Sequence, residues 1–428
     1  MTAQPQVAAF THQLSDHLDG LARFWRERAV DPVAGYHTVF DAEGRADPET
    51  VKSLIAQTRL LWSCTALARV TNDSAFADLA SFGLDYLVAA FGDNRAGGWY
   101  WTVRPDGTPL DSAKLIYGQS FALYALATCA EVLHDDAAHQ AAARTFDAME
   151  SAVDARYGGY LENLDRDWNP ERTPSGERKS LDIHLHLLES FTVLARLTGE
   201  ERHRRRLGEV RGLILDKMID HAAHAGKNQF TVDFRDVLPI VIDRTWIAER
   251  LESPPPAPQF LTTSYGHNLE LGWLLGEADQ VLEGSAAVHT DLVDAIGDHT
   301  LTWGYDAQYG GIYREGPMTG PATDTDKEFW QNAEALVGFL HAYQLTGRPE
   351  YFDAFAHTWE FANRHLIHPT AAEWRIRTTR DGQVIDGALG NQWTGGYHTV
   401  RAAIESVRRL KSLEGPAACD VPSDPKGT

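Results

Sequence analysis

A short segment of small or glycine residues followed by alternating aromatic residues recurs six times along this chain. The pattern is clearest at residues 97–101 (GGWYW) and 310–313 (GGIY), and two weaker copies lack the glycines. Repetition at a near-constant interval indicates a repeat architecture. The copies start at Tyr36, Trp99, Tyr160, Phe230, Ile312 and Trp374, separated by 63, 61, 70, 82 and 62 residues.

Between these segments the hydrophobic residues recur at helical spacing, for example at Phe121, Tyr124 and Ala125. An interval of this length holds two helices and a short pair of strands. Six such units closed into a ring give an all-α (α/α)6 barrel, with short β-segments at one end. We expect a single catalytic domain over residues 1–414 and a flexible tail over 415–428. The alternative is a set of unrelated turns between helices.

Composition excludes several classes of partner. The chain has 39 basic and 60 acidic side chains, a formal net charge of −21, so we expect no nucleic-acid partner and no acidic membrane surface. No apolar run approaches the length of a membrane helix, and no export signal is visible. We therefore expect a cytoplasmic monomer or homodimer. Cys64 and Cys129 lie in helix-like segments and are predicted to be buried thiols, while Cys419 lies in the tail.

Histidines and carboxylates gather near the expected starts of helices. His186 precedes Glu189 by three residues, and His267 precedes Glu270 by three. This spacing places both members of each pair on one helical face. His398 enters a later helix. In a ring, the ends of the inner helices face a common pocket, so these groups can converge although they are far apart in sequence.

Several of these residues also have a purely structural interpretation. His184 is more typical of a histidine that packs in a core, and Glu189 could hold a backbone group or Arg59. A zinc or iron site is the main chemical alternative for these histidines and carboxylates. The usual helical ligand spacings, Glu-x-x-His and His-x-x-x-His, are not found among them. We find no phosphate-binding glycine loop and no nucleophile elbow. We therefore expect no metal and no cofactor.

Histidines, an arginine and carboxylates together suit proton transfer at carbon. Histidine, with a pKa of about 6.5, can remove the proton next to a carbonyl group. A basic residue such as Arg59, which lies within an otherwise apolar helix, can stabilise the resulting enediolate. Aromatic side chains suit stacking on sugar rings; the candidates are Trp62, Tyr117, Trp330, Trp393 and Tyr397.

At these residues the sequence resembles the N-acylglucosamine 2-epimerase superfamily, most closely its cellobiose 2-epimerase-like branch. The resemblance runs from about residue 24 to residue 410, and it implies an (α/α)6 barrel. The segments that carry it are residues 57–62 (QTRLLW), 97–101 (GGWYW), 114–119 (KLIYGQ), 179–189 (KSLDIHLHLLE), 264–270 (SYGHNLE), 330–335 (WQNAEA) and 393–398 (WTGGYH).

The resemblance also implies roles for individual residues. His267 and His398 would be the acid and base that flank C2 of an open-chain aldose, and Glu270 would support His267. His186 would assist ring opening or binding, and Arg59 would stabilise the enediolate. The positions expected to bind the sugar are Tyr117, Asp182, Trp330, Trp393 and Glu334. No metal or redox cofactor is implied, and the expected partner is a small sugar.

Some positions depart from the epimerase branch. Asp182 stands where the branch has Asn, and the mannose and sulfoquinovose isomerases of the superfamily are similar to this chain in having Asp. Phe329 replaces the first of two adjacent Trp. Thr394, Gly395 and Gly396 stand where the branch has Lys, Cys and Pro around the last histidine. A second sugar ring would lie near these positions, so a monosaccharide such as mannose or glucose becomes attractive.

Four functional hypotheses result. The first is a cofactor-independent sugar 2-epimerase that acts at C2 of a free aldose of the mannose or glucose type, or at the reducing end of a disaccharide. The second is an aldose–ketose isomerase, such as D-mannose to D-fructose, in which the proton returns to C1. More distant is an inverting glycoside hydrolase, which needs two carboxylates about 6.5–9.5 Å apart across a cleft, for example Glu270 and Glu334. The fourth is a sugar-binding protein without catalysis.

Overall fold

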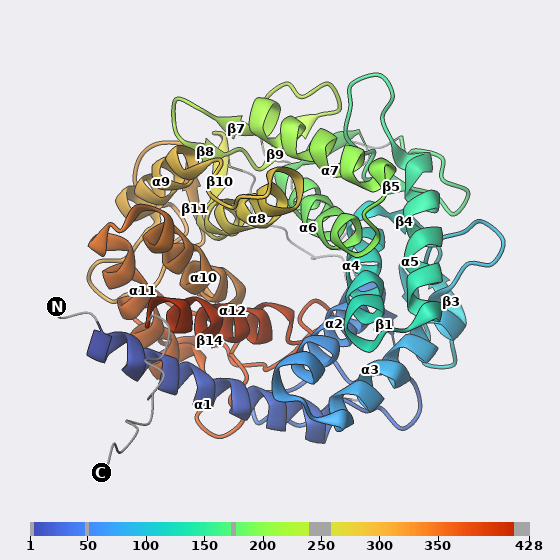
Figure 1. Cartoon of the computed structure of the whole chain (residues 1–428), viewed down its shortest axis with the longest axis horizontal. Helices are drawn as coiled ribbons and strands as arrows, with labels where there is room; N and C mark the ends of the chain where they lie inside the picture. The colour runs from blue at the N-terminus through green and yellow to red at the C-terminus, as the bar shows by residue number, and fades with distance from the viewer. Residues whose placement is uncertain (1–3, 48–50, 173–176, 239–257, 415–428) are drawn as a thin grey trace, which may run out of the picture.

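The computed structural model describes residues 4–47, 51–172, 177–238 and 258–414, and its helices form two concentric rings (Figure 1). Neighbouring helices of the inner ring pack on one another, and the last packs back on the first. This is the predicted (α/α)6 barrel. The inner ring consists of α2 (Leu54–Thr71), α4 (Ile116–Leu133), α6 (Leu181–Thr198), α8 (Tyr265–Glu283), α10 (Phe329–Thr346) and α12 (Tyr397–Leu413). The outer ring consists of α1 (Gln4–Arg28), α3 (Ser74–Tyr86), α5 (Asp136–Met149), α7 (Glu201–Leu213), α9 (Thr290–His299) and α11 (Pro349–Phe361).

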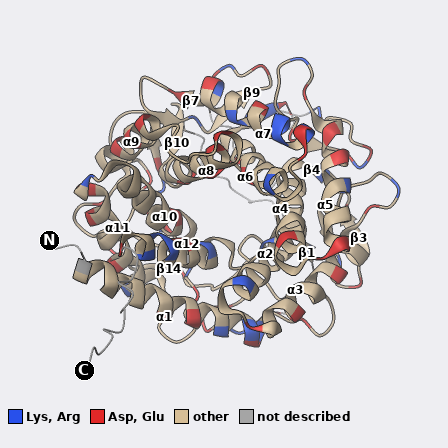
Figure 2. Cartoon of the chain, in the orientation of Figure 1, with Lys and Arg blue, Asp and Glu red and all other residues tan. Residues whose placement is uncertain are grey.

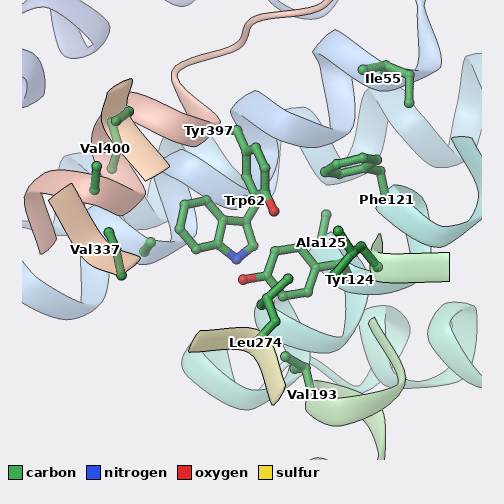
Figure 3. Packing of buried hydrophobic residues seen from close by; sticks show 14 of the residues in the cluster. Ile55, Trp62, Phe121, Tyr124, Ala125, Val193, Leu274, Val337, Tyr397 and Val400 are labelled. Atoms are coloured by element: carbon green, nitrogen blue, oxygen red, sulfur yellow. The ribbon is translucent and has the colours of Figure 1, made fainter. Parts of the chain in front are cut away.

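The helices of the two rings differ in how many of their faces are buried. Every residue of α4 from Ile116 to Ala130 is buried, whereas α5 buries one stripe that includes Ala142 and Phe146. A helix surrounded by other helices must be compatible with burial on all sides, while an outer helix keeps a polar face in water. Aromatic residues of α2, α4 and α12 meet near the barrel axis (Figure 3).

The described cysteines agree with the sequence predictions, whereas one apolar segment does not. Cys64 and Cys129 are fully buried free thiols, as predicted, whereas Cys419 and the predicted tail lie outside the described residues. The segment Ser74–Phe91 is long and apolar enough, by length and composition, to cross a membrane. This differs from the expectation that no such run exists. The segment forms α3 and the following turn η1 (Leu87–Phe91), and it packs on α2 in the outer ring.

Short antiparallel strands lie directly before most inner helices and form one end of the barrel. Their ladders tie each unit to a neighbouring unit, as where β1 pairs with β2. The strands are β1 (Lys52–Ser53), β2 (Thr102–Val103), β3 (Pro109–Asp111), β4 (Lys114–Leu115), β5 (Asn163–Leu164), β6 (Arg178–Ser180), β7 (Ile219–Asp220), β8 (Ala225–Gly226), β9 (Gln229–Thr231), β10 (Thr262–Ser264), β11 (Glu315–Pro317), β12 (Lys327–Glu328), β13 (Arg377–Thr378) and β14 (Val384–Asp386). They form the sheets β1-β2-β3, β4-β5, β6-β9, β7-β8, β10-β11 and β12-β13-β14. Four further short helical turns follow outer helices: η2 (Glu150–Ala152), η3 (Ile214–Met218), η4 (Thr300–Gly304) and η5 (Ala362–Leu366).

The recurring aromatic segments are held by one repeated hydrogen bond. The side chain at the fourth position of an inner helix accepts the backbone N–H of the turn: Gln119 binds Trp99 at 3.0 Å, and His184 Nε2 binds Tyr160 at 3.3 Å. His184 therefore has a structural role, as its structural interpretation predicts: it holds the turn through this hydrogen bond, which we call a turn clamp. The other clamps are Gln57 to Tyr36, Asn268 to Gly226 and Asn332 to Ile312.

This clamp corrects the prediction for the fourth unit. The position equivalent to Trp99 is Gly226, not Phe230, which lies in β9 and pairs with β6. A side chain at position 226 would place its Cβ 2.3 Å from Leu181 Cδ2. Leu181 would have to shift to admit a side chain, so its close approach favours glycine here, and this unit lacks the large apolar residue that the others have at this position.

Candidate functional site

A cavity of about 450 Å³ opens at the strand end of the barrel, between the first turns of the inner helices. Its wall contains most of the side chains singled out from the sequence. Glu270 and Glu334 are exceptions, because both are fully buried beneath it. The predicted residues that line it are Arg59, Tyr117, Asp182, His186, His267, Trp330, Trp393 and His398.

The inner helices bring these residues together in two layers. Side chains four residues apart lie on one face of a helix, so equivalent positions on six helices form rings around the axis. The upper layer comes from the second residue of four helices, namely Tyr117, Asp182, Trp330 and His398. The lower layer comes from the sixth residue, namely Arg59, His186, Glu270 and Glu334.

His398 is held in one orientation by a buried carboxylate. Its Nδ1 lies 2.7 Å from Glu334 Oε1, which also accepts from Arg401 Nη2 at 2.7 Å. Burial raises the pKa of Glu334, and the Arg401 charge opposes that shift; with Glu334 ionised, Oε1 accepts in both contacts and Nδ1 of His398 carries the proton. Burial and the nearby charge of Arg59 lower the pKa of His398 well below its ordinary value. The imidazole is therefore neutral, and its Nε2 has a free lone pair.

His267 is in the opposite electrostatic environment. Its Nε2 lies 3.4 Å from Asp182 Oδ1, and His186 Nε2 lies 3.4 Å from the same oxygen. Burial disfavours the charged form of His267, but the negative charge of Asp182 outweighs this and raises its pKa. The Trp330 ring lies close to both histidines. Its centroid is 4.7 Å from the ring centroid of His267 and 5.5 Å from that of His398.

Arg59 faces the cavity beside aromatic rings. Its Nη2 donates to Tyr117 Oη at 3.0 Å, its Nη1 donates to the Trp393 carbonyl, and its guanidinium lies 4.3 Å from the Phe121 ring centroid. A planar cation with fixed donors at a cavity wall can bind a developing oxyanion.

Arg401, which sequence reasoning missed, lies at the centre of the layer beneath the cavity. It donates hydrogen bonds to Glu189, Glu270 and Glu334 from three different helices. Its side chain is 2% exposed. A signal was available, because buried glutamates need a compensating cation and Arg401 lies one turn after His398 on the same helix.

The contacts of Arg401 revise two predictions about the glutamates. Glu189 does not bind Arg59 but binds Arg401, Tyr397 and His186, the last at 3.2 Å. Burial opposes ionisation of Glu189, yet the Arg401 charge prevails and lowers its pKa to about 2. Glu270 has its hydrogen bond to Arg401, so its influence on His267 in this structure is electrostatic.

The contacts of Arg401 argue against two alternatives, a metal site and an inverting hydrolase. Glu270, Glu334 and His398 place ligand atoms within 4.8 Å of one another, the spacing of a metal site, but the Arg401 guanidinium already binds both carboxylates. An inverting hydrolase needs its two carboxylates about 6.5–9.5 Å apart across a cleft. Glu270 and Glu334 share one guanidinium nitrogen and do not line the cavity.

His186 makes stability depend on pH. Burial alone would lower its pKa, but hydrogen bonds to Asp182 and Glu189 raise it to about 9. Since the folded-state pKa exceeds the unfolded value of about 6.5, this stabilisation is complete below pH ~6.5 and is lost as pH rises through the folded value. The shift corresponds to about 3 kcal/mol.

We therefore expect the free energy of unfolding to fall more steeply between pH 6.5 and 9 in the unchanged protein than in His186→Asn. Urea unfolding followed by circular dichroism at several pH values measures both slopes. Equal slopes in the two proteins would contradict a protonated His186 in the folded state.

Comparison with known proteins shows a consistent set of relatives. Residues 35–402 match the family described as N-acylglucosamine 2-epimerase (GlcNAc 2-epimerase). A cellobiose 2-epimerase of Bacteroides fragilis is 30% identical over 89% of this chain and 94% of its own length. A D-mannose isomerase of Marinomonas mediterranea is 21% identical over 93% and 97%. The solved structure of cellobiose 2-epimerase from Spirochaeta thermophila superposes with a TM-score of 0.84 at 29% identity, covering 96% of this chain and 99% of that one.

Proposed function

Because this chain belongs to the N-acylglucosamine 2-epimerase family, we propose that it is a sugar 2-epimerase that acts at C2 of a free aldose of the mannose or glucose type. The reaction needs no cofactor in this proposal, since a base, an acid and an oxyanion-binding group suffice. The alternative within the same family is an aldose–ketose isomerase that converts D-mannose to D-fructose.

The observation that carries the proposal is that two histidines line one cavity, one held by Glu334 and the other beside Asp182. Glu334 holds the His398 Nδ1–H, which leaves Nε2 free to accept a proton. Asp182 favours the imidazolium form of His267, which can donate one. An enzyme that moves a proton at carbon needs a base and an acid whose environments separate their pKa values.

The proposed reaction follows from these states. His398 removes the C2 proton of the open-chain aldose, the electron pair forms the C1–C2 double bond, and the carbonyl oxygen becomes an enediolate oxyanion. Arg59 stabilises that oxyanion with its guanidinium. His267 then returns a proton to the opposite face of C2, which gives the 2-epimer, whereas a proton delivered to C1 would give the ketose.

Two features support a monosaccharide as the substrate. The cavity of about 450 Å³ lies toward the small end of ligand sites. Phe329, which lines it, stands where the cellobiose 2-epimerase-like branch has a Trp, so less aromatic surface is available near the position where a second sugar ring is expected. The reducing end of a disaccharide remains the alternative substrate.

A proton NMR time course of mannose tests the reaction directly. We expect glucose to accumulate without fructose, and deuterium to enter C2 when the solvent is D2O. Fructose as the main product would establish the isomerase alternative instead. No change in a panel of mannose, glucose, cellobiose and lyxose, together with full sugar binding, would indicate a binding protein.

Asp182→Asn tests the proton state assigned to His267. Removal of a carboxylate 3.4 Å away should lower the pKa of His267 by at least about one unit. The high-pH limit of kcat/KM should then move to lower pH by a similar amount. Asp326→Asn, at a carboxylate outside the cavity wall that pairs with Arg377, is the matched control. An unchanged high-pH limit in Asp182→Asn would contradict the assignment.

A further inference from the structure

A second cavity, of about 800 Å³, lies at the opposite end of the barrel. Its wall comes from later turns of the inner helices, including Arg69 and Thr71 at the end of α2 and Lys411 in the last turn of α12. The two cavities share no wall residue. The buried layer that contains Arg401 and Glu189 separates them.

The inner end of this second cavity is aromatic. Trp62, Tyr124 and Trp273 line it, and the rings of Trp62 and Tyr124 lie nearly parallel, 15° apart with centroids at 5.5 Å (Figure 3). Val193 and Leu274 continue the same wall. Trp62 and Tyr124 stack on each other and Arg401 lies over Trp273, so ring edges rather than open faces, together with the aliphatic side chains, give this end an apolar surface for the C–H face of a sugar ring.

The outer part of the cavity carries balanced charge. The whole cavity wall contains five basic and five acidic residues, of which Arg401 and Glu189 belong to the buried layer, and both signs are interspersed around the barrel (Figure 2). Several form ion pairs between different inner helices. Arg196 binds Glu131 through two contacts of 2.8 and 3.0 Å, and Arg408 lies 3.4 Å from Glu277. Each pair presents a donor and an acceptor side by side, an arrangement that matches neighbouring hydroxyl groups.

Electrostatics disfavours charged ligands here. An anion would meet the carbonyl ends of α2, α6 and α12, which carry partial negative charge. A cation would compete with arginine and lysine side chains that already lie beside the carboxylates. A neutral ligand rich in hydroxyl groups meets neither penalty.

We propose that this cavity is a second carbohydrate-binding site, separate from the catalytic cavity, for a neutral mono- or disaccharide. The ring lies against the aromatic inner end, and the hydroxyl groups bind the Arg–Glu pairs. The choice of a sugar as the ligand agrees with the proposed function and in that respect rests on it. Because Glu189 contacts this cavity and also binds His186, the two sites are one side-chain layer apart.

Methyl α-D-mannopyranoside is the probe, because its blocked C1 prevents ring opening and turnover. Calorimetric titration should show two binding events in the unchanged protein. Thr192→Trp fills the second cavity from α6 and should remove one event, while kcat/KM for mannose stays within about twofold. Thr198→Trp, on the same helix but outside the cavity wall, is the matched control and should retain both.

Arg196→Met changes a partly exposed rim residue and keeps the test decisive if Thr192→Trp fails to fold. It should weaken the same event at least tenfold. A single binding event in the unchanged protein, or two events of unchanged affinity in Arg196→Met, would overturn the second site. Two events in a chain that converts no sugar would instead reject the proposed function and leave this inference standing.

Discussion

Replacement of His398 or His267 by alanine is expected to lower kcat/KM for the aldose at least about 10²-fold, the size of a typical general acid–base contribution. His398 has a free Nε2 because Glu334 holds its Nδ1–H, and His267 faces the same cavity beside Asp182. Loss of His398 should also abolish deuterium uptake at C2 of mannose in D2O, because that step begins the reaction.

His341→Ala is the matched control for these variants. His341 is a buried histidine of inner helix α10, but it contacts Arg409 and lies outside the cavity wall. We expect its kcat/KM to stay near that of the unchanged protein, apart from any loss of folded protein, which circular dichroism measures. Full activity in both His398→Ala and His267→Ala would favour the sugar-binding hypothesis.

Arg401→Met is expected to cost about 3–5 kcal/mol of stability, because it leaves three buried glutamates without their shared cation. The added substitution Glu270→Gln removes one of those negative charges and should recover at least about 1 kcal/mol, since a neutral amide is cheaper to bury than an unpaired carboxylate. Chemical denaturation of the single and double variants measures both changes.

Arg409→Met on the same helix provides the comparison. Arg409 is also buried, but it binds His341 and Gln344 and pairs with one carboxylate, Glu405 at 3.7 Å, rather than with three buried glutamates. Its loss should therefore be smaller, and Glu270→Gln should not relieve it. Equal losses in Arg401→Met and Arg409→Met, with no relief in either double variant, would show that Arg401 does not balance the glutamate charges.

Local patterns predicted much of the site. His186, His267 and His398 were identifiable because the start of an inner helix and its 3.6-residue period are encoded within a few residues. Local patterns failed where a distant contact sets the requirement. Position 226 favours glycine because the Leu181 side chain approaches it, and His184 accepts the backbone N–H of Tyr160, 24 residues earlier.

The sequence by itself determined the ring of helical units and the face on which the reactive histidines lie, because repeat interval and helical spacing are properties of the chain. Tertiary structure alone decided the proton states. Arg401 meets glutamates 67, 131 and 212 residues away, and Asp182 meets His267 from another helix. Protonation depends on burial and on charges within a few ångströms, and only closure of the barrel brings these residues that close.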